Sequence, residues 1–421
     1  MTEKTALALG HYADFKCIGS DCEDSCCCGW RVQIDRETYA AYKANRHPEL
    51  TGLFARAVQR NPAARGSNDY ASITMDDAGR CAFLDAGNLC NIQKHLGHAA
   101  LSTVCSSFPR TANRFGEESE YSLGLACPEA ARLILLDPEP VQFVEIDADP
   151  VLEKPAAVLF RVPAEGRLAP ELMATMNDLR AVVVAILQCR EISIEARLLF
   201  LGRFLEESEQ AMGEGAQGML EHLPAVLGKF AQMLPYAHVM QEQIEALQPN
   251  PLQRLRLFQV VLSDLAPDIR QARLKQCFDE ACAGLSWHPG ETGDDQALVA
   301  KHEEIYRTYY APFFAANAHI LENCLVHHVF RTLFPLRSGG LISQFRELVC
   351  LYLVSHVFLL GMAGFRKGMS NETAIEFVYS FARLSSHSQN YLAQVVESLE
   401  KRLGVDIRNL VGVLLVPPMP K

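Results

Sequence analysis

The segment FKCIGSDCEDSCCCGW, residues 15–30, carries the cysteines Cys17, Cys22, Cys26, Cys27 and Cys28. Its two glycines permit tight turns, so several of these thiols can reach one soft metal centre. Successive side chains diverge, and adjacent cysteines therefore rarely bind the same metal. We therefore expect some of the three consecutive cysteines, Cys26, Cys27 and Cys28, to bind a second metal centre or to pack in the interior. The segment predicts a region whose structure depends on bound metal.

Three further segments add cysteines to this region: CAFLDAGNLCNIQ (81–93), STVCSSFPR (102–110) and GLACPEAARLIL (124–135). In the first of them, residues 85–88 predict a hairpin turn that places the thiols of Cys81 and Cys90 near each other. In the last, a proline follows Cys127, which is typical of a cluster ligand.

Cysteine is distributed unevenly: nine of the 14 cysteines lie in the first 127 residues. Without a secretion signal, a disulfide framework would not persist among cytoplasmic thiol buffers, so the clustered thiols predict metal or iron–sulfur ligands. The alternative, small buried residues, suits the five later cysteines: Cys189, Cys277, Cys282, Cys324 and Cys350. The number of thiols allows one cluster with spare cysteines, two clusters, or one cluster and a zinc ion.

Composition limits the class of protein. The chain has 421 residues, 49% hydrophobic and 21% charged, as in globular proteins. A net charge of −11 argues against nucleic-acid binding, which needs a basic surface. The most apolar segment, residues 348–362, is shorter than the ~20 residues that span a membrane, so we predict a buried core helix and no transmembrane segment. We expect a cytoplasmic protein.

Residue composition and hydrophobic periodicity along the chain predict three parts. Residues 1–136 form an irregular cysteine-rich region with short strands at 30–34, 70–75 and 120–125, and a helix over 36–59 that Asp35 caps. A proline-rich connector, 137–170, includes one strand at 141–146. Residues 171–421 show helical periodicity and predict eight to ten helices. The predicted fold class is mainly α, with the cysteine-rich region packed on a multi-helix domain.

Other cofactor motifs are missing from the sequence. The radical S-adenosylmethionine loop, Cys-x3-Cys-x2-Cys, would need a cysteine at position 29, which is glycine. No Gly-x-Gly-x-x-Gly follows a strand pattern, and neither a Walker loop nor a Gly-x-Ser-x-Gly elbow occurs.

Polar residues in the helical part supply the candidate catalytic residues Glu322, Asn323 and His387. The first two share one side of a helix with His327 and Arg331, and His387 lies one turn from other polar residues. The alternative for both groups is a helix–helix contact or a solvated face. The aromatic stripe between residues 302 and 310 is predicted to be core.

The cysteine segments resemble those of a known family, the flagellin lysine-N-methylases. The similar pieces are FKCIGSDCEDSCCCGWRVQID (15–35), CAFLDAGNLCNIQKHLG (81–97), ALSTVCSSFPR (100–110) and SLGLACPEAARLIL (122–135), in that order. Weaker resemblance continues at ENCLVHHVFRTLFPL (322–336) and SFARLSSHSQNYL (380–392). The cysteine pattern also resembles a broader group of small zinc- or iron-chelating proteins.

The resemblance implies an enzyme that methylates the ε-amino group of lysines in a protein substrate, flagellin, with S-adenosylmethionine as methyl donor. It also implies a 4Fe-4S cluster, with zinc as the alternative metal. Carried over by position, the implied ligands are Cys17, Cys22, Cys26, Cys27, Cys81, Cys90, Cys105 and Cys127. Cys28 stands at a variable position and is excluded.

Two other functions compete with methyl transfer. The first is a non-catalytic zinc- or iron-binding module whose helical part docks a partner protein. The second is a ferredoxin-like electron carrier, which would leave the helical part without a role. The cluster itself could be a structural cross-link, an anchor for the methyl donor or an electron source.

Overall fold

The computed structural model describes residues 5–29, 32–64, 66, 68–77, 79–115, 118–154, 157–162, 169–213, 215–245, 250–386 and 390–414. The chain divides into two compact units. The cysteine-rich unit comprises residues 1–133 and 142–164, and the helical unit comprises residues 134–141 and 165–421. The boundaries at 136 and 170 that composition suggests remain a prediction.

One sheet of the cysteine-rich unit has five described strands in the order β7-β1-β6-β5-β8. Their bounds are β1 (Thr5–Leu9), β5 (Arg110–Phe115), β6 (Glu118–Leu123), β7 (Phe143–Asp147) and β8 (Val158–Val162). The pairs β1–β6 and β5–β8 are parallel, and β1–β7 and β5–β6 are antiparallel. Strands were correctly expected near β6 and β7, whereas β1, β5 and β8 were not foreseen.

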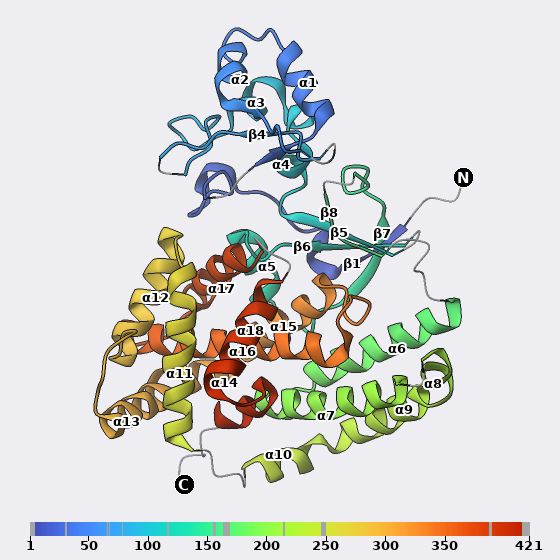
Figure 1. Cartoon of the computed structure of the whole chain (residues 1–421), viewed down its shortest axis with the longest axis vertical. Coiled ribbons are helices and arrows are strands. Elements are labelled where there is room, and N and C mark those ends of the chain that lie inside the picture. The colour runs from blue at the N-terminus through green and yellow to red at the C-terminus, as the bar shows by residue number, and fades with distance from the viewer. Residues whose placement is uncertain are drawn as a thin grey trace. The chain divides into compact units, whose positions relative to one another are not determined.

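A smaller sheet, in the order β2-β4-β3, lies among short helices (Figure 1). The strands are β2 (Gln33–Ile34), β3 (Val58–Arg60) and β4 (Ala71–Ile73), and the helices are α1 (Arg36–Ala44), α2 (Thr51–Ala57), α3 (Asn91–Leu96) and α4 (Thr103–Ser107). A further helix, α5 (Pro128–Leu135), follows β6 in the chain. The single helix expected over 36–59 is wrong, because Pro48 lies in the break between α1 and α2. Asp35 does cap α1: its Oδ1 accepts a hydrogen bond from Thr38 N at 2.7 Å.

Aromatic side chains form the core beside this smaller sheet. Tyr42 stacks on Phe54 with ring centroids 4.4 Å apart, and Phe54 contacts Phe83 at 5.2 Å. Cys81 belongs to this buried core, and Cys27, Cys90 and Cys105 pack against it. The core is small, and its cysteines come from separate segments of the chain.

The helical unit contains α-helices joined by short turns (Figure 1). Their bounds are α6 (Pro170–Leu187), α7 (Ile194–Met212), α8 (Ala216–Glu221), α9 (Leu223–Met233), α10 (Ala237–Glu245), α11 (Pro251–Leu265), α12 (Ala272–Leu285), α13 (Asp295–Ile305), α14 (Ala311–Asn317), α15 (His319–Arg331), α16 (Gly340–Arg366), α17 (Asn371–Ser385) and α18 (Tyr391–Leu403). A π-helical turn, Tyr306–Tyr310, separates α13 from α14. The expected eight to ten helices were too few, because several long periodic stretches break into two or three helices, often at a proline.

Helix α16 is the centre of the helical unit. Within the described part of the chain it is the one helix long and apolar enough to cross a membrane, and 83% of its apolar window is buried inside the fold. This burial confirms the predicted core helix. Helix α12 packs against α16 at very close range, because a Cβ atom on Gly284 would lie 1.8 Å from the carbonyl oxygen of Gly361.

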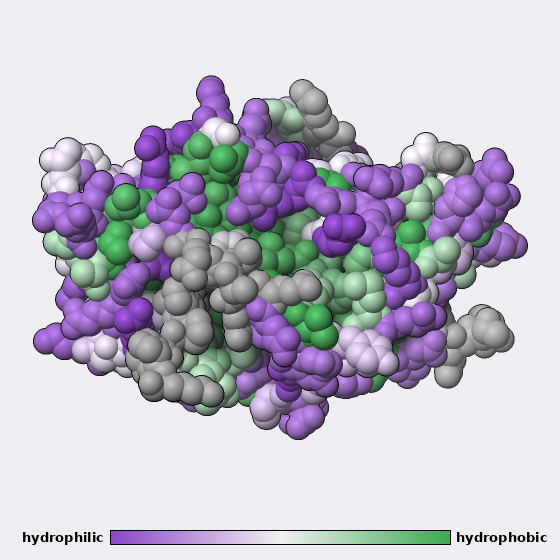
Figure 2. Space-filling model, turned by 90° about the horizontal axis from the view of Figure 1, so that it is seen from below, coloured by the Kyte–Doolittle hydropathy of each residue, from purple (hydrophilic) through white to green (hydrophobic). Residues whose placement is uncertain are grey.

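Hydrophilic residues cover much of the face drawn in Figure 2. Figure 2 shows one face, on which purple hydrophilic residues surround scattered green hydrophobic ones. Large exposed hydrophobic residues include Leu220, Tyr236 and Leu252. Singly exposed apolar residues are normal on protein surfaces, so these carry no functional conclusion.

Candidate metal centre and candidate catalytic residues

The first cysteine segment folds as turns. A 3-10 turn, Gly19–Asp21, separates Cys17 from Cys22. The glycines have the positive φ angles that such turns require, 61° at Gly19 and 81° at Gly29. Both glycines thus adopt the left-handed backbone conformation that permits the expected tight turns.

The second cysteine segment forms the predicted hairpin turn. The Oδ1 atom of Asp85 accepts hydrogen bonds from Gly87 N at 2.8 Å and from Leu89 N at 3.0 Å, and Asn88 has a φ of 60°. An isolated β-bridge joins Leu84 to Cys90 across the turn. The two segments meet where Cys81 N donates to the carbonyl oxygen of Cys27 at 2.8 Å.

Electrostatic interactions connect seven thiols of the cysteine-rich unit: Cys22, Cys26, Cys28, Cys81, Cys90, Cys105 and Cys127. Cys26 joins two parts of this set, since it interacts with both Cys105 and Cys127. Cys81 interacts with Cys28, Cys90 and Cys105. Each of these thiols, which come from all four cysteine segments, therefore lies within electrostatic range of at least one other, and we call these seven residues the thiol cluster.

Burial keeps several of these thiols protonated when no metal is bound. Burial, and to a smaller extent neighbouring thiols, raise the pKa of Cys81 to about 12 and the pKa values of Cys105 and Cys127 to about 11. A bound cation reverses this preference, because metals bind the thiolate and displace its proton. Metal binding to the thiol cluster would therefore release protons.

The donor chemistry of the thiol cluster suits a soft metal centre, because thiolates are the usual ligands of iron–sulfur clusters and of structural zinc. Within the described residues, however, no three Cys, His, Asp or Glu side chains are arranged to hold one metal ion. The predicted ligand set therefore remains a prediction. Cys28, which the family pattern excludes, belongs to the thiol cluster, whereas Cys27 packs against the core and Cys17 is exposed.

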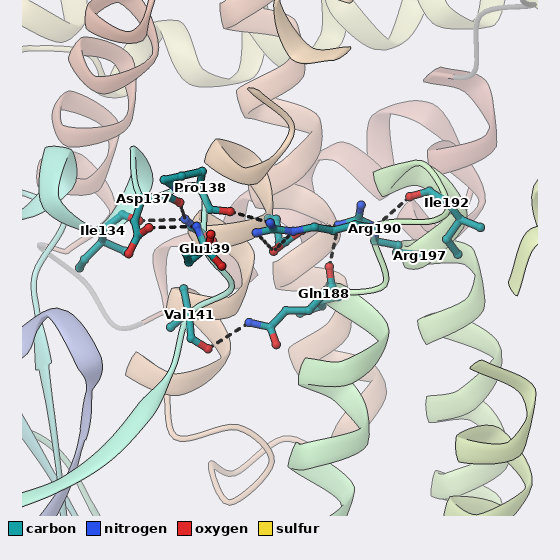
Figure 3. Close-up of polar contacts among 12 residues, drawn as sticks. Ile134, Asp137, Pro138, Glu139, Val141, Gln188, Arg190, Ile192 and Arg197 are labelled. Carbon is teal, nitrogen blue, oxygen red and sulfur yellow. Dashed lines mark hydrogen bonds and ion pairs between the residues drawn. The ribbon is translucent and has the colours of Figure 1, made fainter. Parts of the chain in front are cut away.

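Glu322, a candidate catalytic residue on α15, lies in a buried ion-pair network, and its two partners, Arg190 and Arg197, are labelled in Figure 3. Its side chain is 0% exposed. The carboxylate accepts hydrogen bonds from Arg190 Nε at 3.0 Å and Nη2 at 2.7 Å, and from Arg197 Nη1 at 2.7 Å. A carboxylate held by two guanidinium groups is typical of a structural contact, and this geometry favours the helix–helix alternative.

Asn323 holds the chain segment that follows α5. Its Nδ2 atom donates to the carbonyl oxygens of Ile134 and Asp137, each at 2.9 Å. Nearby, Arg190 Nη1 donates to Pro138 O at 2.5 Å and Gln188 Nε2 donates to Val141 O at 3.1 Å (Figure 3). Together these side chains fasten residues 134–141 to α15 and to the chain that joins α6 to α7. The third candidate, His387, lies outside the described residues.

A buried polar cluster that the sequence did not reveal lies around α16. Tyr352 donates a hydrogen bond to Glu195 of α7, and the hydroxyl oxygen of Tyr310 lies 3.3 Å from His356 Nδ1. Burial lowers the pKa of His356 to about 3, and its Nε2 atom is buried without a hydrogen-bond partner. The sequence shows the four-residue spacing of Tyr352 and His356, but their partners Glu195 and Tyr310 come from segments far away in the chain. The tyrosine ring of Tyr310 and the histidine ring lie 4.8 Å apart, which confirms a core role for this part of the aromatic stripe.

Comparisons with known proteins identify relatives. Residues 180–411 match the FliB lysine N-methylase C-terminal domain. The lysine-N-methylases of Salmonella choleraesuis (strain SC-B67) and Salmonella typhimurium (strain LT2) are each 30% identical to the chain over 230 residues, 54% of this chain and 54% of the relative. The flagellar biosynthetic protein FliU of Salmonella muenchen is 37% identical over 142 residues, 33% of this chain and 82% of the relative.

The match thus spans about half the length of the two lysine-N-methylases. No solved structure matches the chain. The matched C-terminal domain covers more than half of the chain and includes every helix from α7 to α18. The protein therefore belongs to the FliB lysine N-methylase family.

Proposed function

We propose that the protein is a protein-lysine N-methyltransferase that transfers a methyl group from S-adenosylmethionine to lysine ε-amino groups of flagellin. The observation that carries the proposal is the match of residues 180–411 to the FliB lysine N-methylase C-terminal domain. Support for a flagellar substrate comes from the similarity to a flagellar biosynthetic protein. Its cellular location, on this proposal, is the cytoplasm, where the substrate is made and thiols stay reduced.

The proposed reaction forms one bond and breaks one. The lysine nitrogen attacks the methyl carbon, a C–N bond forms, the C–S bond breaks, and the sulfonium leaves as a neutral thioether. The amine must first lose a proton, since free lysine has a pKa of ~10.4, and that proton passes to a base or to water. Positioning in line with the C–S bond supplies much of the rate enhancement.

We further propose that four cysteines, drawn from the thiol cluster and the other implied ligands, hold a 4Fe-4S cluster that serves as a structural cross-link. The cysteine-rich unit supports this role, because its core beside the smaller sheet is small and most of its elements there have fewer than eight residues. A cross-link between four segments would stabilise such a region. When bound, the 4Fe-4S cluster would also hold its cysteine ligands as thiolates, although burial keeps these thiols protonated in the absence of metal.

The first test measures methyl transfer directly. Purified protein, flagellin and S-adenosylmethionine are combined, and mass spectrometry of flagellin peptides should show methylated lysines. A flagellin variant that lacks the modified lysines is the substrate control. Absence of methylation by metal-replete protein would contradict the proposed activity.

The second test addresses the metal. Anaerobically purified protein should contain iron and acid-labile sulfide in equal amounts, about four of each per chain. Cys22→Ser and Cys26→Ser should bleach the visible absorbance and abolish methylation. Cys189→Ser is the matched control, because this half-buried cysteine lies on the helical unit, outside the thiol cluster. Zinc without sulfide would replace the iron–sulfur proposal by a zinc site, and full cluster content in both variants would remove these cysteines from the ligand set.

A further inference from the structure

The cysteine-rich unit contains a cavity of about 620 Å³. Helix α1 forms one wall, the chain from Leu96 to Thr103 forms another, and Lys154 contributes from a third segment. Small-molecule sites commonly have volumes of roughly 300–1,000 Å³, so the cavity has the size for a ligand of a few hundred daltons. Neither the family match, which begins at residue 180, nor the predicted ligand set assigns a role to this cavity.

The cavity offers charges of both signs. Asp35 and Glu37 supply carboxylates, and Arg36 and Lys154 supply cations. Asp35 is held in place, since its carboxylate accepts hydrogen bonds from Thr38 Oγ1 at 2.8 Å and from Thr103 Oγ1 at 3.4 Å. A ligand that carries both an ammonium group and a carboxylate, as the free end of an amino acid does, complements these walls.

Other parts of the lining are apolar or carry amides. Ala40, Ala41 and Leu101 provide an apolar surface, against which a flat ring can pack. Asn45 and Asn68 present amide groups that can both donate and accept hydrogen bonds. This combination suits a nucleoside, whose base has two flat apolar faces and a polar edge.

Tyr42 connects the cavity to the thiol cluster. This residue lines the cavity and is 4% exposed, and its hydroxyl donates to the carbonyl oxygen of Ala100 at 2.9 Å. Cys90 and Cys105 pack against the same buried core as Tyr42. The wall of the cavity therefore rests on the part of the fold that the proposed metal cross-links.

We propose that this cavity binds the methyl donor, a nucleoside that carries an amino-acid tail, which is the chemical class of S-adenosylmethionine. The inference rests on the proposed function, since only a methyl-transfer reaction calls for such a ligand. Lys154 and Arg36 would attract the carboxylate of the tail, and the acidic residues would attract its ammonium group. Loss of the metal would weaken donor binding, because Tyr42 and the Leu96–Thr103 wall would lose their support.

The test uses binding of S-adenosylhomocysteine, the unreactive product of methyl transfer, to the full metal-replete chain, measured by calorimetry. Ala41→Trp places a large side chain in the cavity and should weaken binding by at least about tenfold. Ala44→Trp is the matched control: Ala44 is exposed on the same helix and does not line the cavity. Lys154→Glu should weaken binding by about tenfold, whereas Lys43→Glu, also outside the cavity, should not.

Two outcomes overturn the inference. In the first, Ala41→Trp and Lys154→Glu bind S-adenosylhomocysteine with the same affinity as the unchanged protein. In the second, the unchanged protein does not bind S-adenosylhomocysteine. Should Ala41→Trp fail to fold, Ala99→Trp on the Leu96–Thr103 wall replaces it, since Ala99 is exposed and lines the same cavity. The proposed function fails separately. A protein that binds the nucleoside through this cavity but leaves flagellin unmethylated would refute the activity alone, and flagellin methylation that Ala41→Trp leaves unchanged would refute the cavity alone.

Discussion

The two units use the same residue, cysteine, in opposite ways. In the cysteine-rich unit, thiols from four segments interact electrostatically, and one of them, Cys26, is exposed, as is Cys17 outside the thiol cluster. In the helical unit, Cys277, Cys282 and Cys350 are 0% exposed and lie within long helices. Burial raises the pKa of Cys277 and of Cys282 to about 12. The comparison shows that a buried thiol can serve simply as a small apolar side chain, whereas a metal site needs thiols that converge.

The largest expected difference between the units is in thiol reactivity. In metal-free native protein, iodoacetamide should modify Cys17 and Cys26 rapidly and Cys277 at least about a thousandfold more slowly, because Cys277 reacts only after the helical core opens. Peptide mass spectrometry over a time course measures both rates. Metal loading should protect Cys26 and leave the rate at Cys277 unchanged. Similar rates for Cys26 and Cys277 in metal-free protein would contradict the contrast.

The second prediction concerns the buried ion pairs of the helical unit. Glu322→Gln should lower the free energy of unfolding by about 3–5 kcal/mol, because Arg197, whose side chain is 3% exposed, would lose its counter-charge. Glu207→Gln is the control: its partner Lys229 is 51% exposed, and such surface pairs contribute about 0–1 kcal/mol. Urea unfolding compares the two variants. Equal losses would show that the Glu322 network is no more important than a surface pair.

The third prediction tests the close contact between α12 and α16. Gly361→Ala should cost about 3 kcal/mol, because the new Cβ atom would lie 2.5 Å from the carbonyl oxygen of Ala281 and the helices would have to separate. Gly228→Ala on α9 has open space around it and should stabilise the fold by about 0.5–1 kcal/mol. Thermal unfolding measures both changes. A neutral Gly361→Ala would mean that this contact does not limit the packing of the core.

The smallest expected effect depends on pH. An unfolded histidine has a pKa of about 6.5, whereas burial lowers the pKa of His356 to about 3 in the folded protein. The unfolded chain therefore binds a proton first as the pH falls below 6.5, and the fold loses stability. Between pH 7.5 and pH 5 this histidine should account for about 2 kcal/mol of lost stability.

The variant His356→Gln should reduce that pH dependence, measured by urea unfolding at the two pH values. His288→Gln is the control, because the side chain of His288 is 50% exposed. An unchanged slope in His356→Gln would show that His356 is not buried in its neutral form.

Local patterns predicted many elements but not their breaks. The pattern predicted Asp35 as a helix cap and residues 85–88 as a turn because their hydrogen bonds join residues no more than four apart in the chain. Local patterns did not predict strand β8, because its partner β5 lies more than 40 residues earlier in the chain. Similarly, the counter-charges of Glu322 come from α7 and from the residues just before it, more than 120 residues away.

The sequence by itself determined the cysteine-rich segments, the helical character after residue 170 and the resemblance to lysine N-methylases, because these depend on residue type and short spacing. Only the tertiary structure decided which thiols lie together, that Glu322 is neutralised by two arginines, and that a cavity opens beside Tyr42. Such features join residues far apart in the chain. Their energies come from burial and from contacts that exist only after the chain has folded.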